Sequence, residues 1–547
     1  MRSNAVPQKV FLPLLLLLAV VLLAYSNTFS ASFQIDDFHQ IVDNTYVRDL
    51  QNIPGFFIDP GMENTTPDYY RPVTFASFAV NYAVSGYKVW GWHAFNMLLH
   101  FLNAFLVYMI VKAVYKGEGR DAGDAVPLIA AVLFAVHPIQ TGAVTYISGR
   151  AVLMASFFSL FSFLCFRAYR ASGGLVYAVG AVGAFLLGML SKEMAVGTIG
   201  IMLAYDAVYT TPGRGGIRGF ARVHAIYGAL SAVLVIYLYY RSLLLGVLTM
   251  PRPQFGMSEY LLSEAKAFFL YCRLMALPMN QDSDYGIPVT AAVDWKVVLS
   301  VLSILGAVAC LYRTRRKNPA ASFFGLWFLI ALMPEATLTA IKDIVQEYRL
   351  YLPSAGLIAY ASIWGAGLVV RQRFKRLALV FVVVLFGILT FCRNGVWETQ
   401  ASLRADALRK SGCPGEAHLK LGAVLYREGR FPEAAAEFAR SLESQGCVSA
   451  SKESFDSLGR YLASTGDHET AVRMFRKAAE LEPGAESYMR LGYECYASKR
   501  YQDALEALQN AARVSPALPK ARLLLAKTYH MLGRSKDALR EIDLAAR

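Results

Sequence analysis

The sequence has few charged residues and no cysteine pattern that indicates a metal site. Charged residues make up 17% of the 547 positions, against about 25% in an average soluble domain. The seven cysteines contain no CxxC pair and no Cys/His cluster, so neither a zinc site nor a disulfide-rich fold is indicated. Cys413 and Cys447 could form a disulfide in an oxidising compartment, but two packed thiols explain them equally well.

Apolar residues take the place of the missing charge. Hydrophobic residues account for 55% of the chain, aromatic residues account for 13%, and the mean hydropathy is +0.37. A soluble domain cannot bury that much apolar surface, so the composition indicates an integral membrane protein. We predict about eleven membrane spans. They lie near residues 10–25, 92–111, 126–142, 150–167, 174–190, 193–210, 223–246, 294–312, 320–334, 350–370 and 376–392.

The distribution of basic residues predicts how these spans are oriented. The net charge of +14 would suit a nucleic-acid binder, but the basic residues are confined to gaps between apolar runs. With a cytoplasmic N-terminus and a retained first span, alternate loops bring every basic cluster to the cytoplasmic side, as the positive-inside rule requires. The apolar segment 258–278 would break this alternation, so we interpret it as interfacial or re-entrant. The basic clusters lie at 112–120, 167–170, 214–222, 313–317 and 371–376.

This orientation places residues 26–91 outside as one long loop, with seven acidic and three basic residues. Near its start stands the pair Asp36 and Asp37, about one membrane thickness after the chain enters the first span. A carboxylate at the hydrocarbon boundary can be ionised yet partly desolvated, as a general base requires. A solvated loop that happens to contain two aspartates is the alternative interpretation.

A second candidate group begins a later span, within residues 346–354. The planar guanidinium of Arg349 suits a phosphate at the lipid boundary. Glu347 would orient that guanidinium or contact a sugar hydroxyl, and Tyr351 lies beside them in the sequence. A structural ion pair between Glu347 and Arg349 is the alternative.

Polar residues also fall within the spans, where they are costly and usually functional. Four of them share one face of the helix predicted at 92–111, and hydrogen bonding between helices explains them as well as substrate contact does. The four are His93, Asn96, His100 and Asn103, with His93 nearest the outer boundary. Other candidates at the outer ends of spans are His137, Arg150 and Lys192. Taken singly, each of these is also explained as an interfacial residue.

After about residue 391 the composition changes to a repeat of about 34 residues. Each unit has a Leu-Gly or Leu-Ala marker, followed by an alanine thirteen residues after the leucine. Small residues let paired helices approach closely, and this pattern is typical of tetratricopeptide repeats, which present a groove to peptides or partner proteins. A spacer role is the alternative. The markers are Leu421-Gly422, Leu458-Gly459, Leu491-Gly492 and Leu525-Ala526, and the alanines are Ala434, Ala471, Ala504 and Ala538.

Several short motifs occur together in a specific order. They are Phe33-Gln-Ile-Asp-Asp37, Tyr70-Arg-Pro-Val73, Trp92-His-Ala-Phe-Asn96, Phe134-Ala-Val-His-Pro138, Gly149-Arg150, Ser191-Lys-Glu193 and Glu347-Tyr-Arg-Leu-Tyr-Leu-Pro353, followed by the repeats. With them the chain resembles, over nearly its whole length, the eukaryotic transmembrane-and-tetratricopeptide O-mannosyltransferases of the GT-C glycosyltransferase superfamily. The short repeat array and compact loops suggest a bacterial member.

The resemblance implies an all-α protein with a GT-C-type membrane domain over residues 1–395, a linker at 396–414 and four repeats over 415–547. It implies transfer of mannose or another hexose from a polyprenyl-phosphate carrier to a Ser/Thr hydroxyl of an exported protein. The repeats would lie in the periplasm beyond a bacterial inner membrane, or in the ER lumen of a eukaryote. Membrane lipids and a protein bound by the repeats are the expected partners, with no nucleic acid.

Within that mechanism Asp37 would take the proton of the acceptor hydroxyl in an inverting displacement, while Asp36 orients it or binds acceptor. Arg349 is the first choice for the carrier phosphate. A divalent cation, Mg²⁺ or Mn²⁺, could bind Asp36 and Asp37, but an arginine or lysine can neutralise a monophosphate, so we do not expect an obligate metal. The other donor-side candidates are Glu347, Lys192, Arg150, His137, His93 and Tyr351, and the acceptor-side candidates are Tyr70 and Arg71.

Two other classes of protein are possible from the sequence. A membrane-anchored tetratricopeptide scaffold without catalysis would use the spans only as an anchor, and about eleven spans exceed that need. A transporter would be expected to show internal pseudo-symmetry or helices interrupted at the bilayer midplane, and the sequence shows neither.

Overall fold

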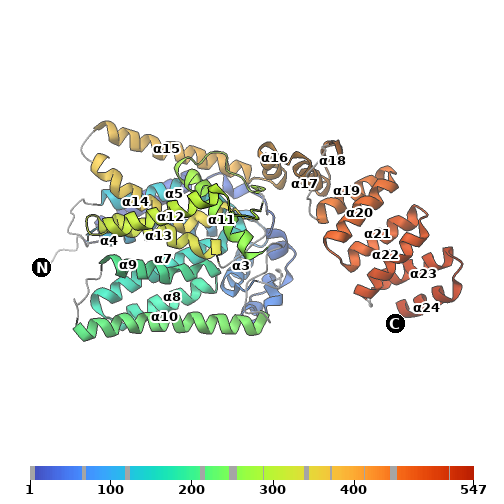
Figure 1. Ribbon diagram of the computed structural model, residues 1–547, viewed down its shortest axis with the longest axis horizontal. Coiled ribbons are helices and arrows are strands. Elements are labelled where there is room, and N and C mark those ends of the chain that lie inside the picture. Colours follow the sequence, from blue (N-terminus) through green and yellow to red (C-terminus); the bar gives the residue numbers. More distant parts are fainter. Residues whose placement is uncertain are drawn as a thin grey trace. The chain divides into compact units, whose positions relative to one another are not determined.

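The computed structural model describes residues 6–63, 69–116, 124–209, 216–245, 256–287, 289–337, 344–369, 373–411, 413–443, 452–515 and 518–546. These residues form helices and connecting turns, with no strand among them, which confirms the predicted all-helical fold. The chain divides into two compact units, Met1–Ser402 and Leu403–Arg547 (Figure 1).

The first unit is a bundle of long apolar helices (Figure 1). A region of loops and shorter helices lies at one end of the bundle. Between α1 and α4, the described residues form the short helices α2 and α3 and several single turns. The bounds of the helices are α1 (Val6–Ala24), α2 (Ile53–Phe56), α3 (Pro72–Ser85), α4 (Val89–Lys116), α5 (Ala125–Val136), α6 (Thr141–Val144), α7 (Arg150–Ser172), α8 (Leu175–Met189), α9 (Gly197–Tyr209), α10 (Gly216–Leu245), α11 (Met257–Ala276), α12 (Trp295–Thr314), α13 (Pro319–Thr337), α14 (Tyr351–Val369) and α15 (Arg373–Val396). Helix α16 (Gln400–Lys410) begins in the first unit and continues into the second.

Each predicted span is occupied by a helix, but fewer of these helices are long and apolar enough to cross a bilayer alone. Within the described residues there are five such helices, and α5 with the following Pro138–Val144 forms a bent pair. Helices α8 and α9 have 15 and 13 residues, short of the roughly 20 that a straight span needs. The length and apolar composition of these helices therefore indicate a membrane protein. The predicted count of about eleven spans is not confirmed. The five are Val89–Tyr115, Ile147–Ser172, Arg222–Leu245, Trp295–Thr314 and Arg376–Val396.

The polar face predicted on α4 points into the bundle and connects it to the neighbouring helices. Nδ1 of His100 lies 2.7 Å from the Tyr351 hydroxyl, and its Nε2 lies 3.0 Å from a backbone oxygen at the end of α5. Asn103 donates to the same Tyr351 hydroxyl and to the Leu153 carbonyl. His100, Asn103 and Tyr351 are buried, so these groups join α4, α5, α7 and α14.

After α16, the described residues of the second unit form four helix pairs, which confirms the tetratricopeptide pattern. In two of the pairs, a Cβ added at the marker glycine of the first helix would lie under 3 Å from a phenylalanine ring of the second: Gly422 against Phe438, and Gly459 against Phe475. The marker must therefore be small because the second helix packs its ring there. The bounds are α17 (Pro414–Arg427), α18 (Phe431–Glu443), α19 (Lys452–Thr465), α20 (His468–Leu481), α21 (Ala485–Ala497), α22 (Tyr501–Val514), α23 (Pro519–Met531) and α24 (Ser535–Ala546).

Candidate functional site

The carboxylate pair stands on a tight turn that follows α1 and begins with an unusual backbone conformation. Ile35 has a φ of +37°, which is rare for a β-branched residue and is maintained only where the surrounding structure requires it. The turn leaves Asp37 fully buried, whereas Asp36 stays partly exposed. The two side chains therefore meet different surroundings, although they are adjacent in the chain.

Three hydrogen bonds fix the carboxylate of Asp37. Oδ2 accepts from the backbone N–H of Gln34 at 2.8 Å. Oδ1 accepts from the backbone N–H and the hydroxyl of Ser148, at 2.8 and 2.5 Å. Ser148 lies two residues before α7, so these bonds attach the loop between α1 and α4 to the start of a long helix. Oδ2, with a single hydrogen bond, retains a lone pair for another donor.

Burial changes the acidity of Asp37. Because the carboxylate is removed from water, its pKa rises to about 7, although the hydrogen bonds from Ser148 and Gln34 act in the opposite direction. The neighbouring charge of Asp36 raises it further. A group with such a pKa can accept and release a proton near neutral pH, which is what a general base needs.

Two aromatic residues connect this turn to the segment around Glu347. The backbone N–H of Asp36 donates to the Tyr146 hydroxyl at 3.1 Å, and the Tyr146 ring stacks on Trp397 with centroids 5.6 Å apart. A Cβ added at Gly142 would contact both Trp397 and Glu347, at 4.0 and 3.7 Å. Helix α6 thus touches both groups, which brings the two predicted candidate segments into one region.

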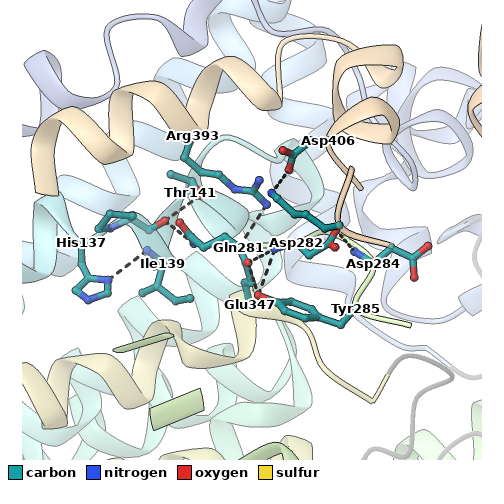
Figure 2. Close-up of polar contacts among 12 residues, drawn as sticks. His137, Ile139, Thr141, Gln281, Asp282, Asp284, Tyr285, Glu347, Arg393 and Asp406 are labelled. Atoms are coloured by element: carbon teal, nitrogen blue, oxygen red, sulfur yellow. Dashed lines mark hydrogen bonds and ion pairs between the residues drawn. The ribbon is translucent and has the colours of Figure 1, made fainter. Parts of the chain in front are cut away.

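Glu347 is held in a cage of donors (Figure 2). Its Oε1 accepts from the backbone N–H of Asp282 and from the Tyr285 hydroxyl, both at 2.7 Å, and its Oε2 accepts from Gln281 Nε2 at 3.1 Å. Arg393 Nη2 lies 3.8 Å from Oε2. Burial raises the pKa of Glu347 above its usual value, although the charge of Arg393 and the hydrogen bonds from Tyr285 and Asp282 act in the opposite direction. The cage anchors the loop that follows α11.

Arg349 points to a different partner from the one expected. Its Nη1 lies 2.5 Å from Glu264 Oε1 and donates to the Ile344 carbonyl at 2.6 Å. The Arg349 side chain is 1% exposed and that of Glu264 is 4% exposed. The structure does not contain the alternative ion pair between Arg349 and Glu347. Glu347 instead forms an ion pair with Arg393 and hydrogen bonds with the loop at 281–285. Arg349 therefore joins its loop to α11.

Arg150 is also occupied by structural contacts. Its guanidinium donates to the side-chain oxygens of Asn96 and Asn81 at 2.9 and 2.6 Å, and to the backbone oxygens of Ser77 and Trp92. The side chain is fully buried. Because these contacts use Nε, Nη1 and Nη2, Arg150 joins α3, α4 and α7 in this structure.

The two candidate histidines and Tyr70 contact backbone oxygens of neighbouring segments. His93 Nε2 lies 2.9 Å from the Ala31 oxygen, and His137 Nε2 lies 3.1 Å from the Met275 oxygen. His137 stands at the 52° bend between α5 and Pro138–Val144. The Tyr70 hydroxyl donates to the Phe57 carbonyl at 2.8 Å. These contacts hold the loop between α1 and α3 at Ala31 and Phe57, and the end of α11 at Met275.

A chain of charges lies at the start of α3. Both oxygens of Glu63 accept from the backbone N–H of Arg71, at 2.8 and 3.0 Å, and Arg71 Nη2 lies 3.2 Å from Glu193 Oε2. The Thr74 hydroxyl donates to the Ser191 carbonyl at 3.0 Å, so the 191–193 segment is bound to α3. These contacts place the Ser191-Lys-Glu193 motif beside the Tyr70-Arg-Pro-Val73 motif.

Burial and the neighbouring positive charges have opposite effects on the pKa values of Glu63 and Glu193. Burial raises the pKa of Glu63 well above its usual value, against the hydrogen bond from Arg71. Burial also raises the pKa of Glu193, but the charges of Arg71, Arg241 and Lys192 outweigh it, so its pKa lies below the usual value. Lys192 Nζ stands 4.4 Å above the Tyr348 ring, so this cationic group is next to the Glu347 segment.

Several residues of this region were not predicted. Ser148, Tyr146 and Trp397 contact the aspartate turn, and Glu264 holds Arg349. Glu264 could have been found from its position in an apolar segment, where an acidic residue requires a partner. The partners of Asp37 carry no comparable signal. Within the described ranges, no three His, Cys, Asp or Glu side chains are grouped so as to hold a metal ion.

Comparisons with known proteins agree with both units. Tetratricopeptide repeat models match residues 399–446, 457–519 and 496–547. Protein O-mannosyl-transferase Tmtc3 of Drosophila melanogaster is 24% identical over 89% of this chain and 61% of its own length. Human protein O-mannosyl-transferase TMTC3 is 24% identical over 92% and 56%, and protein O-mannosyl-transferase F38B6.6 of Caenorhabditis elegans is 26% identical over 76% and 60%. The chain spans about 60% of the length of these relatives.

Among solved structures, the crystal structure of MamA is similar over 27% of this chain and 85% of its own. The identity is 19% and the TM-score 0.23.

Proposed function

We propose that this chain, which is similar to protein O-mannosyl-transferases over most of its length, is a membrane glycosyltransferase. It transfers a hexose, mannose by that similarity, from a polyprenyl-phosphate carrier to a Ser or Thr hydroxyl of an exported protein. The observation that carries the proposal is the buried carboxylate of Asp37, held at the end of a long apolar bundle with a pKa of about 7.

The reaction is a single displacement at the anomeric carbon. The acceptor oxygen forms the new bond to that carbon while the bond to the phosphate oxygen breaks, and the phosphate leaves with the electron pair. Asp37 Oδ2 takes the hydroxyl proton as the oxygen attacks. Attack from the face opposite the leaving group inverts the anomeric centre. Asp36, partly exposed beside it, binds the acceptor.

We assign the carrier phosphate to Lys192 and Arg71 instead of Arg349. The guanidinium of Arg349 is buried against Glu264, and that of Arg150 is bound by asparagine and carbonyl oxygens. Arg71 Nε, by contrast, is buried with no hydrogen-bond acceptor in the described part of the chain. A buried donor without a partner costs about 1–3 kcal/mol, and a phosphate oxygen would satisfy it. Lys192, on the neighbouring motif, adds the second positive charge.

This assignment predicts an effect on donor binding. Arg71→Gln is expected to raise KM for the polyprenyl-phosphate hexose by about tenfold or more, because a charge-assisted hydrogen bond to phosphate contributes roughly 1.5–3 kcal/mol. The KM for an acceptor peptide should change little. Initial rates at varied donor concentration measure this, with the exposed Lys88→Gln of the same loop as control. An unchanged donor KM in Arg71→Gln would contradict the assignment.

The pH dependence follows from the raised pKa of Asp37. The carboxylate acts only when ionised, so kcat/KM should fall as pH decreases through about 7 and level off above it. A free aspartate would place that fall near pH 4. The profile is measured with saturating acceptor and limiting donor between pH 5 and about 9. A rate that is constant down to about pH 5 would show that Asp37 is not the base.

The second part of the proposal concerns the side of the membrane on which the repeats lie. Cys413 of the second unit is disulfide-bonded, and Cys447, the partner that the sequence left open, lies outside the described residues. Disulfides persist in oxidising compartments, so we place the repeats outside the cytoplasm, in the periplasm of a bacterium. The positive-inside pattern leads to the same orientation.

Thiol labelling tests this orientation. In denatured protein from cells lysed with a thiol blocker, Cys413 should resist maleimide until a reductant is added, whereas Cys310 and Cys392, which are free and exposed, should be blocked from the start. Mass spectrometry of the labelled peptides reads out both. Cys413 blocked together with the free thiols would mean a reduced pair and would remove this support for an extracytoplasmic array.

The function itself is tested by intact-mass analysis of exported proteins from cells with and without the chain. A hexose on Ser/Thr peptides that depends on the chain supports the proposal and identifies the acceptor. If no exported protein changes mass while partner binding through the repeats persists, the chain is a membrane-anchored scaffold instead.

A further inference from the structure

Two side chains beside the Asp37 turn carry buried polar atoms that the fold itself does not use. Gln34 is 2% exposed, and its Oε1 accepts no hydrogen bond from the described part of the chain. Trp397 is 6% exposed, and among the same residues its Nε1 has no acceptor. A buried polar atom normally has a partner, so one acceptor and one donor are available here to a ligand.

Hydrogen bonds hold Gln34 against both Trp397 and the proposed base. Its Nε2 donates to the Trp397 carbonyl at 3.2 Å and to the Ser32 hydroxyl at 3.1 Å. Its backbone N–H donates to Asp37 Oδ2 at 2.8 Å. Because a carbonyl can only accept, the amide nitrogen of Gln34 must face Trp397, which fixes the direction of Oε1. Gln34 therefore presents a fixed acceptor next to the carboxylate that takes the proton.

The indole of Trp397 is held in place as well. The Tyr146 ring stacks on it with centroids 5.6 Å apart, and the Tyr146 hydroxyl accepts from the backbone N–H of Asp36 at 3.1 Å. A Cβ added at Gly142 of α6 would lie 4.0 Å from Cζ2 of the indole. The aspartate turn and α6 thus both position Trp397. A donor fixed in this way loses little conformational freedom when a ligand binds.

We propose that Gln34 and Trp397 bind the main chain of the acceptor at the serine or threonine that receives the sugar, and this inference rests on the proposed function for the reaction at Asp37. A backbone N–H of the acceptor donates to Gln34 Oε1, and a backbone carbonyl of the acceptor accepts from Trp397 Nε1. These two contacts direct the acceptor hydroxyl toward Asp37 Oδ2. Gln34 and Trp397 are acceptor-binding residues, and neither exchanges a proton with the substrate.

A peptide main chain fits this pair better than the sugar donor does. Every non-proline residue carries one N–H and one carbonyl, so any acceptor sequence supplies the donor for Gln34 and the acceptor for Trp397. Both side chains are neutral, whereas a carrier phosphate requires cations such as Arg71. A helix already uses the N–H and carbonyl groups of its main chain. The acceptor class is therefore an extended or unfolded Ser/Thr segment.

Binding of a labelled Ser/Thr peptide to the full chain in nanodiscs, measured by fluorescence anisotropy, tests this inference. Trp397→Phe removes Nε1 and keeps an aromatic ring beside Tyr146. We expect it to weaken peptide binding by about three- to tenfold, as the loss of one neutral hydrogen bond does, with the KM for polyprenyl-phosphate hexose unchanged. The matched variant Trp90→Phe makes the same change at a 52% exposed position and should bind the peptide as wild type does.

A peptide analogue tests the same contacts on the wild-type chain. Its two peptide bonds flanking the serine are replaced by trans alkenes, which keep the extended shape but remove the N–H and carbonyl groups. The analogue should bind wild type about tenfold more weakly than the peptide does. Trp397→Phe should weaken its binding no further, because the carbonyl that Nε1 contacts is already absent.

Two kinds of result would overturn the inference. One is equal binding of the peptide and the analogue by wild type, a comparison that holds even if Trp397→Phe fails to fold. The other is a folded Trp397→Phe variant with unchanged peptide affinity, and a raised donor KM in that variant would assign Nε1 to the sugar donor instead. A chain that binds the peptide through Trp397 but transfers no hexose would contradict only the proposed function.

Discussion

Asp37→Asn is expected to lower kcat for hexose transfer by about 10²–10⁴-fold, because base assistance to a hydroxyl nucleophile typically contributes that much. Asparagine has the same shape and can still accept the hydrogen bonds of Ser148 through its side-chain oxygen, although its amide nitrogen can no longer accept from the Gln34 N–H. Donor KM should therefore change little. Initial rates with a polyprenyl-phosphate hexose and a Ser/Thr peptide measure the effect.

Stability measurements show whether the loss is chemical. Because the pKa of Asp37 is raised on folding, the folded protein binds a proton that the unfolded chain releases between about pH 4 and 7, so this group destabilises the fold as pH rises through that window. Asparagine does not ionise, so the stability of Asp37→Asn should lack the decrease that wild type shows as pH rises from about 4 to 7. An active Asp37→Asn variant, or one that fails to fold, would contradict the assigned role.

Arg349→Met is expected to reduce the free energy of unfolding by about 3–5 kcal/mol, because it leaves Glu264 buried without its cation. Loss of the hydrogen bond to Ile344 adds to the effect. Thermal unfolding of the purified chain, followed by tryptophan fluorescence at several pH values, measures the change. Activity should fall only as far as the folded fraction does.

The double variant Arg349→Met/Glu264→Met provides the control. Replacing both members of a buried pair by apolar residues of similar volume is often neutral or stabilising, so the double variant should recover most of the lost stability. A double-mutant cycle then isolates the coupling between the two groups. A stable Arg349→Met variant with a much higher donor KM would instead show that Arg349 binds the carrier phosphate.

The difference over Arg349 shows what the sequence could and could not predict. The motif around Glu347 and Arg349 indicated two functional charges, and both are buried. Their partners, Glu264 and the loop at 281–285, are more than sixty residues away in the chain. Sequence spacing predicts which residues share a helix face, but it carries no information on contacts between distant helices. The contacts of Arg349 and Glu347 with these distant segments could therefore not be predicted from the sequence.

Local sequence patterns predicted the helices and the repeats better than they predicted contacts between distant residues. The four marker-and-alanine units occupy four helix pairs, because helix-pair packing depends on small residues at fixed spacing. The polar face of α4 was recognised from its three- and four-residue spacing, while its structural role through Tyr351 required the fold. Helix positions followed from hydropathy, but the number of spans did not, since several apolar helices are short or bent.

The most direct test of the account combines the purified chain in nanodiscs with a polyprenyl-phosphate hexose and a Ser/Thr peptide, followed by the intact mass of the peptide. The account predicts that wild type adds one hexose to the peptide and that Asp37→Asn adds none at the same time point. If folded wild-type protein leaves the peptide mass unchanged with every polyprenyl-phosphate hexose offered, or if both proteins modify it equally, the assignment of Asp37 to sugar transfer is wrong.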